Sequence, residues 1–425
     1  MGNETAVELA ASSIRFGPGV TREIGMDLAD AGLKRALIVT DPRVAKLPPT
    51  AAVIEALESE RIPFTLFDQV SVEPTDASFQ KAIAFAEGVE FDAIVAVGGG
   101  SVIDTAKAVN LYTCYPADFL DYVNPPIGAG KPVPGPLKPL YAVPTTAGTG
   151  SEVTGVSIFD YVAMRAKTGI AHRRLKPTLG YLDPHNTRTL PGPVAASTGL
   201  DVLSHAIESY TAVPYTQRPG VERPSARPAY QGSNPISDVW ALESLRMVRD
   251  YLPRAVQSPE DDEARGMMLL AASYAGIGFG NAGCHLPHGM SYPVSAQVRE
   301  FHMDGYPDDE PLVPHGVSVI LNSPAVFRFT AAACPERHLR AAEVLGADIT
   351  GVSTDRAGEV LADTITGYMR RLGAPNGLSA VGYSTADVPA LVEGALPQHR
   401  VTKLSPRPAA AEDLAAMFED AMHAL

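Results

Sequence analysis

The sequence predicts an N-terminal α/β domain with a parallel, Rossmann-like sheet, followed by an all-α C-terminal domain. Over roughly the first 190 residues, short β-rich runs alternate with helical patterns, which is typical of βαβ units. Beyond Leu190-Pro191-Gly192-Pro193 the pattern changes to long segments with helical spacing. At 425 residues the chain exceeds the size at which one core stops growing, so we expect two domains, 1–192 and 193–425.

Apolar periodicity locates the main elements. The expected strands are Ala36–Thr40, Phe64–Phe67, Ala93–Val97 and Leu140–Val143. The expected helices are Val194–Tyr210, Ile236–Leu252, Asp262–Phe279 and Thr354–Leu372. Long loops, which are usually functional or disordered, are expected in three stretches rich in Pro, Gly and charge: Tyr115–Lys138, Ala212–Ser233 and Val298–Pro314.

Composition excludes some classes of partner. The net charge of -14 argues against nucleic acid or an anionic membrane surface, since both need a basic face. The three cysteines are few and have no short spacing, which favours a reducing compartment. The first residues contain neither an apolar signal core nor an Arg-rich leader, and no run of about eighteen apolar residues occurs. We therefore expect a cytosolic protein.

The pair Asp201 and His205 is the strongest chemical signal. The two residues lie one helical turn apart in an apolar segment, and two further histidines, His288 and His315, each precede a glycine. Three neutral nitrogens and one anionic oxygen suit a divalent ion such as Fe²⁺ or Zn²⁺, with room for a substrate oxygen. An Asp and a His at this spacing also form ordinary surface ion pairs. A metal beside a dinucleotide suggests hydride transfer to or from an alcohol.

Two turns that follow strands have the composition of a dinucleotide site. Gly98-Gly99-Gly100-Ser101 ends one strand and opens a helix in which Ser101 and Asp104 have the spacing of a capping box. Glycines there let a pyrophosphate approach backbone amides. The segment Pro144–Glu152, which contains Thr145, Thr146 and Thr149, adds hydroxyls that can bind phosphate and ribose. A tight turn and an ordinary loop are the alternatives.

Asp41 closes the strand Ala36–Thr40. A carboxylate in this position can accept hydrogen bonds from an adenosine ribose and repel a 2′-phosphate, which favours NAD over NADP. Asp41 followed by Pro42 is also typical of a helix N-cap and its first residue. Both interpretations stay open.

Taken together, these motifs resemble the iron-containing (group III) alcohol dehydrogenase family over nearly the whole chain, with its dehydroquinate synthase-like fold. The resemblance is closest to the transhydrogenase branch of that family. The segments that carry this closer likeness are Asn110–Asn124, Arg227–Asp238, Gly278–Gly283, Val381–Ser384 and Val401–Leu404.

The resemblance implies a role for each candidate residue. The implied metal ligands are Asp201, His205, His288 and His315, with Fe²⁺ as the metal and Zn²⁺ as the alternative. NAD is implied to lie across Asp41, Gly98 to Ser101 with Asp104, Thr145, Thr146 and Thr149, with Lys176 near the nicotinamide. No side chain beyond the metal ligands is implied to be catalytic. An oligomer, a dimer or larger, is also implied.

Two residues near the third implied ligand, His285 and Tyr292, bear on its assignment and on proton transfer. His285 competes with His288, but the His288-Gly289-Met290 context matches the family's ligand position, so we expect His285 in the core or behind the ligands. Many family members carry a histidine four residues after the third ligand, where this chain has Tyr292. A phenol is a poor base at neutral pH, so a proton relay through this position is in doubt.

The activity implied by the transhydrogenase branch is transfer of hydride from a hydroxy acid, such as 4-hydroxybutyrate, to an oxo acid, such as 2-oxoglutarate, through bound NAD. Carboxylate substrates require a cation, and the candidates are Arg173, Arg174, Arg218, Arg223 and Arg227. An alternative is an NAD(P)-dependent alcohol dehydrogenase acting on aliphatic alcohols and aldehydes. A dehydroquinate synthase-like lyase is disfavoured because its first metal ligand is typically a glutamate.

Overall fold

The computed structural model describes residues 2–164 and 166–424. Its contacts divide the chain into two compact units. The first, here called the α/β unit, comprises Ala11–Leu190 with Pro259–Gly276. The second, the helical unit, comprises Met1–Ala10, Pro191–Ser258 and Ile277–Leu425. Both units are discontinuous in sequence, and the division into domains 1–192 and 193–425 stays a prediction.

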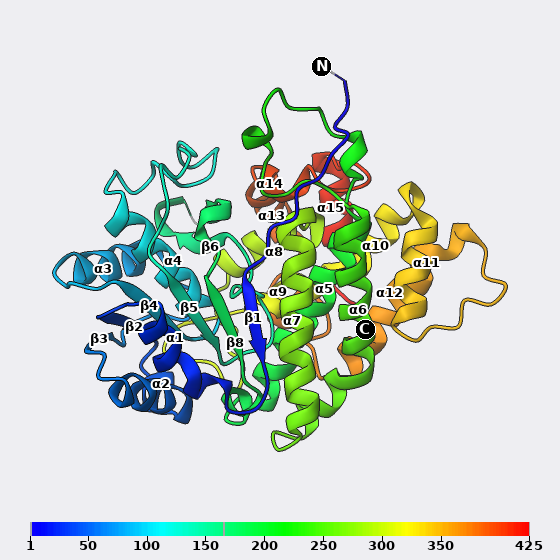
Figure 1. The fold of residues 1–425 in the computed structure, drawn as a ribbon. Coiled ribbons are helices and arrows are strands. Elements are labelled where there is room, and N and C mark those ends of the chain that lie inside the picture. Colours follow the sequence, from blue (N-terminus) through cyan, green and yellow to red (C-terminus); the bar gives the residue numbers. More distant parts are fainter. Residues whose placement is uncertain (1, 165, 425) are drawn as a thin grey trace. The chain divides into compact units, whose positions relative to one another are not determined.

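The α/β unit is built on a six-stranded sheet with the order β1-β8-β5-β4-β2-β3 (Figure 1). Every neighbouring pair in it is parallel, which confirms the predicted parallel sheet. β1 and β8 were not expected from the sequence. The strands are β1 (Ser13–Phe16), β2 (Ala36–Val39), β3 (Phe64–Phe67), β4 (Ala93–Gly98), β5 (Leu140–Pro144) and β8 (Leu179–Leu182).

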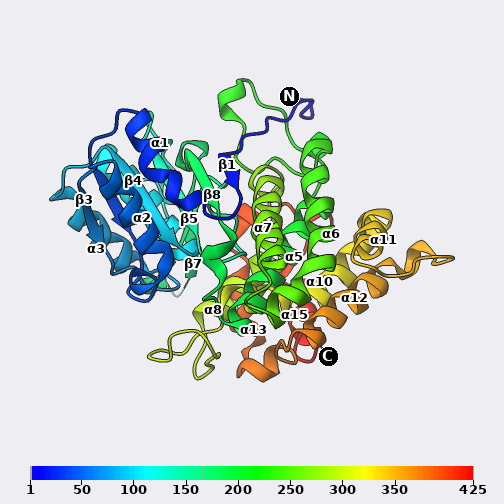
Figure 2. The ribbon, with the colours of Figure 1, turned by 60° about the horizontal axis from the view of Figure 1, so that its bottom comes forward.

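Helices cover both faces of this sheet (Figure 2). Ala36 and Ile38 of β2 pack with α1 (Ile24–Asp30) and α2 (Pro48–Ser59). Leu37 and Val39 of the same strand pack with helices α3 (Asp76–Glu87) and α4 (Gly100–Cys114). Successive strand residues point to opposite faces, so a strand covered on both faces is apolar throughout, as the sequence of β2 is.

A separate antiparallel hairpin follows β5 in the same unit. It consists of β6 (Val156–Tyr161) and β7 (Ala166–Ala171). Lys167 of β7 is buried and pairs with Glu73 (2.6 Å) and Asp160 (3.2 Å). These carboxylates outweigh burial and raise the pKa of Lys167.

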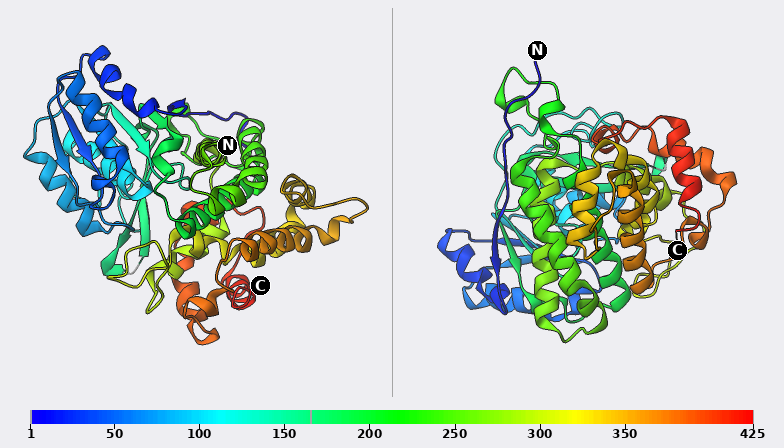
Figure 3. Two further views of the ribbon diagram at one scale, coloured as in Figure 1. Left: turned by 90° about the horizontal axis from the view of Figure 1, so that it is seen from below. Right: turned by 90° about the vertical axis from the view of Figure 1, so that its right-hand side faces the viewer.

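The helical unit contains the long helices α5 (Gly192–Thr211) and α6 (Pro235–Gln257), which pack against each other (Figure 3). α7 (Asp262–Ala282) contributes its first part to the α/β unit and its last turns to the helical unit. The other helices are α8 (Leu286–Ala296), α9 (His315–Ile320), α10 (Ser323–Thr330), α11 (Pro335–Val344), α12 (Ala357–Arg371), α13 (Val388–Ala395), α14 (His399–Thr402) and α15 (Ala411–Asp420).

The four predicted helical segments lie in α5, α6, α7 and α12. α5 begins with Pro193 in its first turn, where a missing N–H costs nothing, and most of its length is buried. None of the helices in the described part of the chain combines the length and the hydropathy of a membrane-spanning segment.

Candidate active site

Helix α5 supplies three acidic or imidazole side chains from one face. Asp201, His205 and Glu208 follow one another at intervals of four and three residues, which places them in line along a helix. Their exposed fractions are 2%, 4% and 0%. Charged groups buried this deeply need partners or a metal.

Two short helices bring the remaining histidines to α5. His288 lies in the first turn of α8, and His315 is the first residue of α9, which packs against α5. A Cβ on Gly316 would lie only 2.0 Å from the carbonyl oxygen of Ser197, so glycine is required after His315 for α9 to approach α5 this closely.

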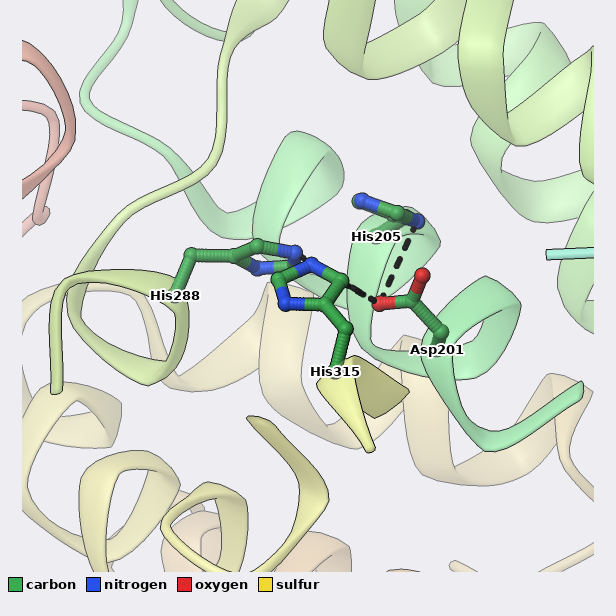
Figure 4. Close-up of side chains that lie close together, drawn as sticks. All are labelled: Asp201, His205, His288 and His315. Carbon is green, nitrogen blue, oxygen red and sulfur yellow. Dashed lines mark ion pairs between the residues drawn. The ribbon is translucent and has the colours of Figure 1, made fainter. Parts of the chain in front are cut away.

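The four side chains converge on one carboxylate oxygen (Figure 4). Oδ1 of Asp201 lies 3.7 Å from Nδ1 of His205, 3.5 Å from Nε2 of His288 and 3.8 Å from Nε2 of His315. The His205 ring stacks on Phe279, with centroids 4.0 Å apart, and this contact fixes its plane.

These distances fit a shared ion better than direct bonds. Separations of 3.5 to 3.8 Å are too long for hydrogen bonds. Two donors that each lie about 2.1 Å from one ion in a tetrahedral array are about 3.4 Å apart. Oδ1 of Asp201, Nδ1 of His205 and Nε2 of His288 are buried and hydrogen-bonded to no described residue. The donor set therefore fits a divalent transition metal.

Glu208 stands behind His288 and was missed by the sequence analysis. Its Oε1 lies 2.5 Å from Nδ1 of His288, and its Oε2 accepts the backbone N–H of His285 at 2.7 Å. A carboxylate on the far nitrogen fixes the ring orientation and leaves Nε2 directed at the cluster. The signal was the interval Asp201, His205, Glu208 along one helix face.

Burial and neighbouring charges set the protonation of this cluster. Burial lowers the pKa of His205 to about 3, so its ring is neutral at physiological pH. Burial alone would raise the pKa of Asp201, but His205 and His315 hold it well below its usual range. Burial is also outweighed at His288, whose pKa is raised by Cys284, Glu208 and Asp201.

His285 lies outside the group of four. It precedes α8, and its Nε2 is 3.0 Å from Oγ1 of Thr211. Burial lowers the pKa of His285 to about 4. Its position in the core agrees with the sequence interpretation.

In the α/β unit, the two predicted turns meet at the carboxyl ends of β4 and β5. The backbone N–H of Thr145 donates to the carbonyl of Gly98 at 3.1 Å. A Cβ on Gly99 would lie 3.2 Å from Oγ1 of Thr146, and one on Gly100 would lie 2.6 Å from Cγ2 of Thr149. The structure thus brings together glycines and hydroxyls that were predicted separately, at the sheet edge where open α/β folds bind ligands.

The expected capping box of Ser101 and Asp104 is wrong. α4 already begins at Gly100, with Gly99 as its N-cap, because the glycine backbone can enter the helix without a capping side chain. Ser101 lies inside the first turn, and its Oγ accepts the N–H of Glu73 at 3.3 Å. Asp104 accepts from the hydroxyl of Ser151 and from the N–H of Ile158 (2.9 Å), so it braces the turn from behind.

Asp41 lies just beyond β2, at the same edge of the sheet. Its Oδ1 accepts the backbone N–H groups of Arg43 and Val44, both at 2.9 Å. Its side chain therefore holds the turn that leads into Val44–Lys46, although the N-cap residue of that segment is Arg43 and not Asp41. Contact with a ribose stays a prediction.

Lys176 follows the short turn Arg173–Leu175 of the α/β unit. Its Nζ lies 3.4 Å from the carbonyl oxygen of Val153. Burial, and then the charge of Lys107, lower the pKa of Lys176 to about 8. A role near the nicotinamide stays a prediction.

Most arginines proposed for substrate carboxylates have partners within the protein. Arg227 pairs with Glu4 at 3.1 Å, and Arg218 donates to the carbonyl of Tyr230. Arg174 donates to the carbonyl of Val133 at 3.1 Å. Arg223 is exposed, and Arg173 lies in the turn before Lys176.

Comparison with known proteins agrees with this arrangement. Residues 11–184 match the family model "Iron-containing alcohol dehydrogenase", and residues 229–422 match the C-terminal model of the Fe-containing alcohol dehydrogenase family. The chain belongs to this family. It is 58% identical over 421 residues to a mitochondrial hydroxyacid-oxoacid transhydrogenase of Xenopus tropicalis, which covers 99% of the chain and 91% of that relative.

Solved structures of the family share the fold. A 1,3-propanediol oxidoreductase superposes with a TM-score of 0.85 at 28% identity, covering 98% of this chain and 100% of its own. A sulfoacetaldehyde reductase from Bifidobacterium kashiwanohense, solved in complex with NAD⁺, has a TM-score of 0.79 at 26% identity, covering 98% of both chains. As a member of the family, the chain is an oxidoreductase that uses a metal and NAD.

The expectation of a cytosolic protein is wrong. The curated transhydrogenases that match the chain are named as mitochondrial proteins. Few unpaired cysteines favour a reducing compartment, but they do not distinguish one reducing compartment from another.

Proposed function

We propose that the chain is a hydroxyacid-oxoacid transhydrogenase. It moves hydride from a hydroxy acid such as 4-hydroxybutyrate to bound NAD⁺, and from the resulting NADH to an oxo acid such as 2-oxoglutarate. In the first half-reaction the hydroxyl carbon gives up a hydride and the hydroxyl gives up a proton; in the second the carbonyl receives both. The observation that carries the proposal is 58% identity, over 99% of the chain, to a protein of that name.

In this proposal Asp201, His205, His288 and His315 hold one divalent ion, Fe²⁺ with Zn²⁺ as the alternative. The support is their convergence on one buried oxygen and the absence of a hydrogen-bond partner, among the described residues, for three of the converging atoms: Oδ1 of Asp201, Nδ1 of His205 and Nε2 of His288. A bound ion supplies Lewis-acid polarisation of a substrate oxygen. Glu208 holds the His288 ring, and Phe279 holds the His205 ring.

NAD is proposed to bind where β2, β4 and β5 end. Gly98, Gly99 and Gly100 expose backbone for the pyrophosphate, while Thr145, Thr146 and Thr149 supply hydroxyls. Ser101 completes the turn and Asp104 positions it through Ser151. Asp41 is proposed at the ribose and Lys176 at the nicotinamide end.

The test is transfer without added nucleotide. Purified enzyme mixed with 4-hydroxybutyrate and 2-oxoglutarate should form 2-hydroxyglutarate with ping-pong kinetics, because each acid must leave before the other binds. Denatured enzyme should release stoichiometric NAD(H). If no 2-hydroxyglutarate forms, while added NAD supports steady oxidation of short alcohols, the chain is an ordinary alcohol dehydrogenase. The names of the solved relatives make that the second candidate.

A further inference from the structure

Arg400 is a cation of the helical unit whose hydrogen bonding is incomplete. Its Nη2 donates to the phenol oxygen of Tyr292 at 2.9 Å, and its guanidinium lies over the ring of Tyr230, 5.1 Å from the centroid. Its Nη1 is buried and has no hydrogen-bond partner among the described residues. Nor does any carboxylate in the described part of the chain form an ion pair with Arg400. Arg400 as a residue is half-buried, but a guanidinium nitrogen that is buried without a partner is costly unless an anion completes it.

Arg400 also lies in the neighbourhood of the four candidate metal ligands. Tyr292 follows His288 by one turn of α8, a rise of about 6 Å.

A glycine in α8 allows α14 to approach it closely. A Cβ on Gly289, the residue after His288, would lie 2.6 Å from Cγ2 of Thr402. Glycine at this position therefore lets α14, which carries Arg400, pack directly against the ligand-bearing turn of α8.

Both proposed substrates carry a carboxylate at the same number of bonds from the carbon that gives up or receives hydride. In 4-hydroxybutyrate the carboxyl carbon is three carbon–carbon bonds from the carbon that loses hydride. In 2-oxoglutarate the distal carboxyl carbon is three carbon–carbon bonds from the carbon that receives it. One anion-binding group can therefore serve both half-reactions.

We propose that Arg400 binds this shared carboxylate. The inference rests on the transhydrogenase function proposed above and identifies its specificity-determining residue. Nη1 of Arg400 donates to the carboxylate, which forms the charge-assisted hydrogen bond that the protein leaves unmade. Tyr292 holds Nη2 and thereby orients the guanidinium. This gives a physical reason for tyrosine where many family members carry histidine.

The experiment compares an acid with an alcohol of the same length. Wild type, Arg400→Gln, Arg400→Lys and the control Arg299→Gln are assayed with added NAD on 4-hydroxybutyrate and on butan-1-ol. Arg299 is exposed and pairs with Asp387 (2.9 Å) on the surface. The ratio of kcat/KM for the acid to that for the alcohol should fall about 10- to 100-fold in Arg400→Gln, because only the acid loses a charged hydrogen bond. Arg400→Lys should fall less, and Arg299→Gln should keep the wild-type ratio.

Butyrate provides a binding readout that needs no turnover of an acid. As an inhibitor of butan-1-ol oxidation, it should have a Ki about 10- to 100-fold higher in Arg400→Gln than in wild type. An unchanged ratio and Ki in the Arg400 variants overturns the inference, and so does an equal loss on acid and alcohol, which indicates a structural role. If Arg400→Gln fails to fold by circular dichroism, the Arg400→Lys values decide.

The two proposals can fail separately. Because NAD is supplied, the ratio can be measured whether or not the enzyme retains its own cofactor. An enzyme that fails the nucleotide-free transfer test but prefers the acid through Arg400 overturns only the transhydrogenase function. A wild-type enzyme that oxidises butan-1-ol and is not inhibited by butyrate has no carboxylate site, which overturns both.

Discussion

The group of four ligand-type residues in the helical unit and the glycine-rich turns of the α/β unit are built from different parts of the chain. The first consists of side chains, Asp201 with three histidines, whose donor atoms meet because helices carry them together. The second consists of backbone made accessible by missing side chains, as at Gly99 and Gly100. A side-chain site is therefore sensitive to removal of atoms, and a backbone site to their addition.

The largest effect should follow the loss of a donor atom. His205→Ala should lose the metal and nearly all turnover, since Lewis-acid polarisation is worth several kcal/mol, or about 10³-fold or more in rate. Elemental analysis and the rate of alcohol oxidation measure both. His302→Ala, which alters an exposed histidine, should keep both. Full metal content in His205→Ala would exclude His205 as a ligand.

A smaller effect is expected when the residue that orients a candidate metal ligand is changed. Glu208→Gln keeps the shape but removes the charge that holds Nδ1 of His288, so metal affinity should fall about 10- to 100-fold. Competition with a chelator measures the affinity. Glu243→Gln, on the surface of α6, is the matched control. Equal affinities in the two variants would show that Glu208 does not support the metal.

Adding one carbon tests the backbone site. In Gly100→Ala the new Cβ would meet Thr149 at 2.6 Å, and overpacking of this kind costs about 1–3 kcal/mol. Where the turn must keep its shape to bind nucleotide, this cost corresponds to a loss of about 5- to 150-fold in NADH affinity. Nucleotide fluorescence titration measures it. Gly367→Ala on α12 is the control, because nothing lies within 4 Å of its Cβ. Unchanged NADH binding in Gly100→Ala would move the nucleotide away from this turn.

The smallest effect is a change of cofactor preference. Asp41→Asn keeps an oxygen that can hold the turn leading into Val44–Lys46 but removes the charge that would repel a 2′-phosphate. The ratio of kcat/KM for NADP to that for NAD should rise about tenfold, equivalent to about 1.4 kcal/mol. Asp41→Gly should do the same with lower stability. If the ratio is constant in both, Asp41 only holds the turn.

The strands and helices that the sequence predicted are those with an uninterrupted period. β2 to β5 are apolar runs, and α5 to α7 repeat apolar residues over several turns. β1 and β8 were missed for physical reasons. β1 is a half-exposed edge strand with Arg15 in its centre, and β8 contains Gly180, which weakens any strand pattern. Both strands exist because tertiary pairing overrides local preference.

Within the candidate active site, the ligand-type residues could be predicted from the sequence, whereas the residues that orient or surround them could not. The sequence indicated Asp201 with three histidines, but Glu208 resembled a solvated helix residue because glutamate is rarely buried. Arg400, next to His399, likewise resembled a solvated helix residue, while two of the three arginines in the loop Ala212–Ser233, Arg218 and Arg227, have partners elsewhere in the protein. Whether a charged residue is solvated or belongs to a site depends on the residues around it in the fold, and those residues are distant in sequence.

The four candidate ligands come from segments that are far apart along the chain, on α5, α8 and α9. A bound ion would therefore act as a cross-link that closes two loops of the chain, one from His205 to His288 and one from His288 to His315. Cross-links of this kind remove conformations from the unfolded chain, and their effect grows slowly with loop length. Metal loading would then determine the resistance of the helical unit to heat and to proteolysis, in addition to the activity of the enzyme. The α/β unit contains none of these four residues, and only its segment Pro259–Gly276 lies inside a loop that the cross-link would close.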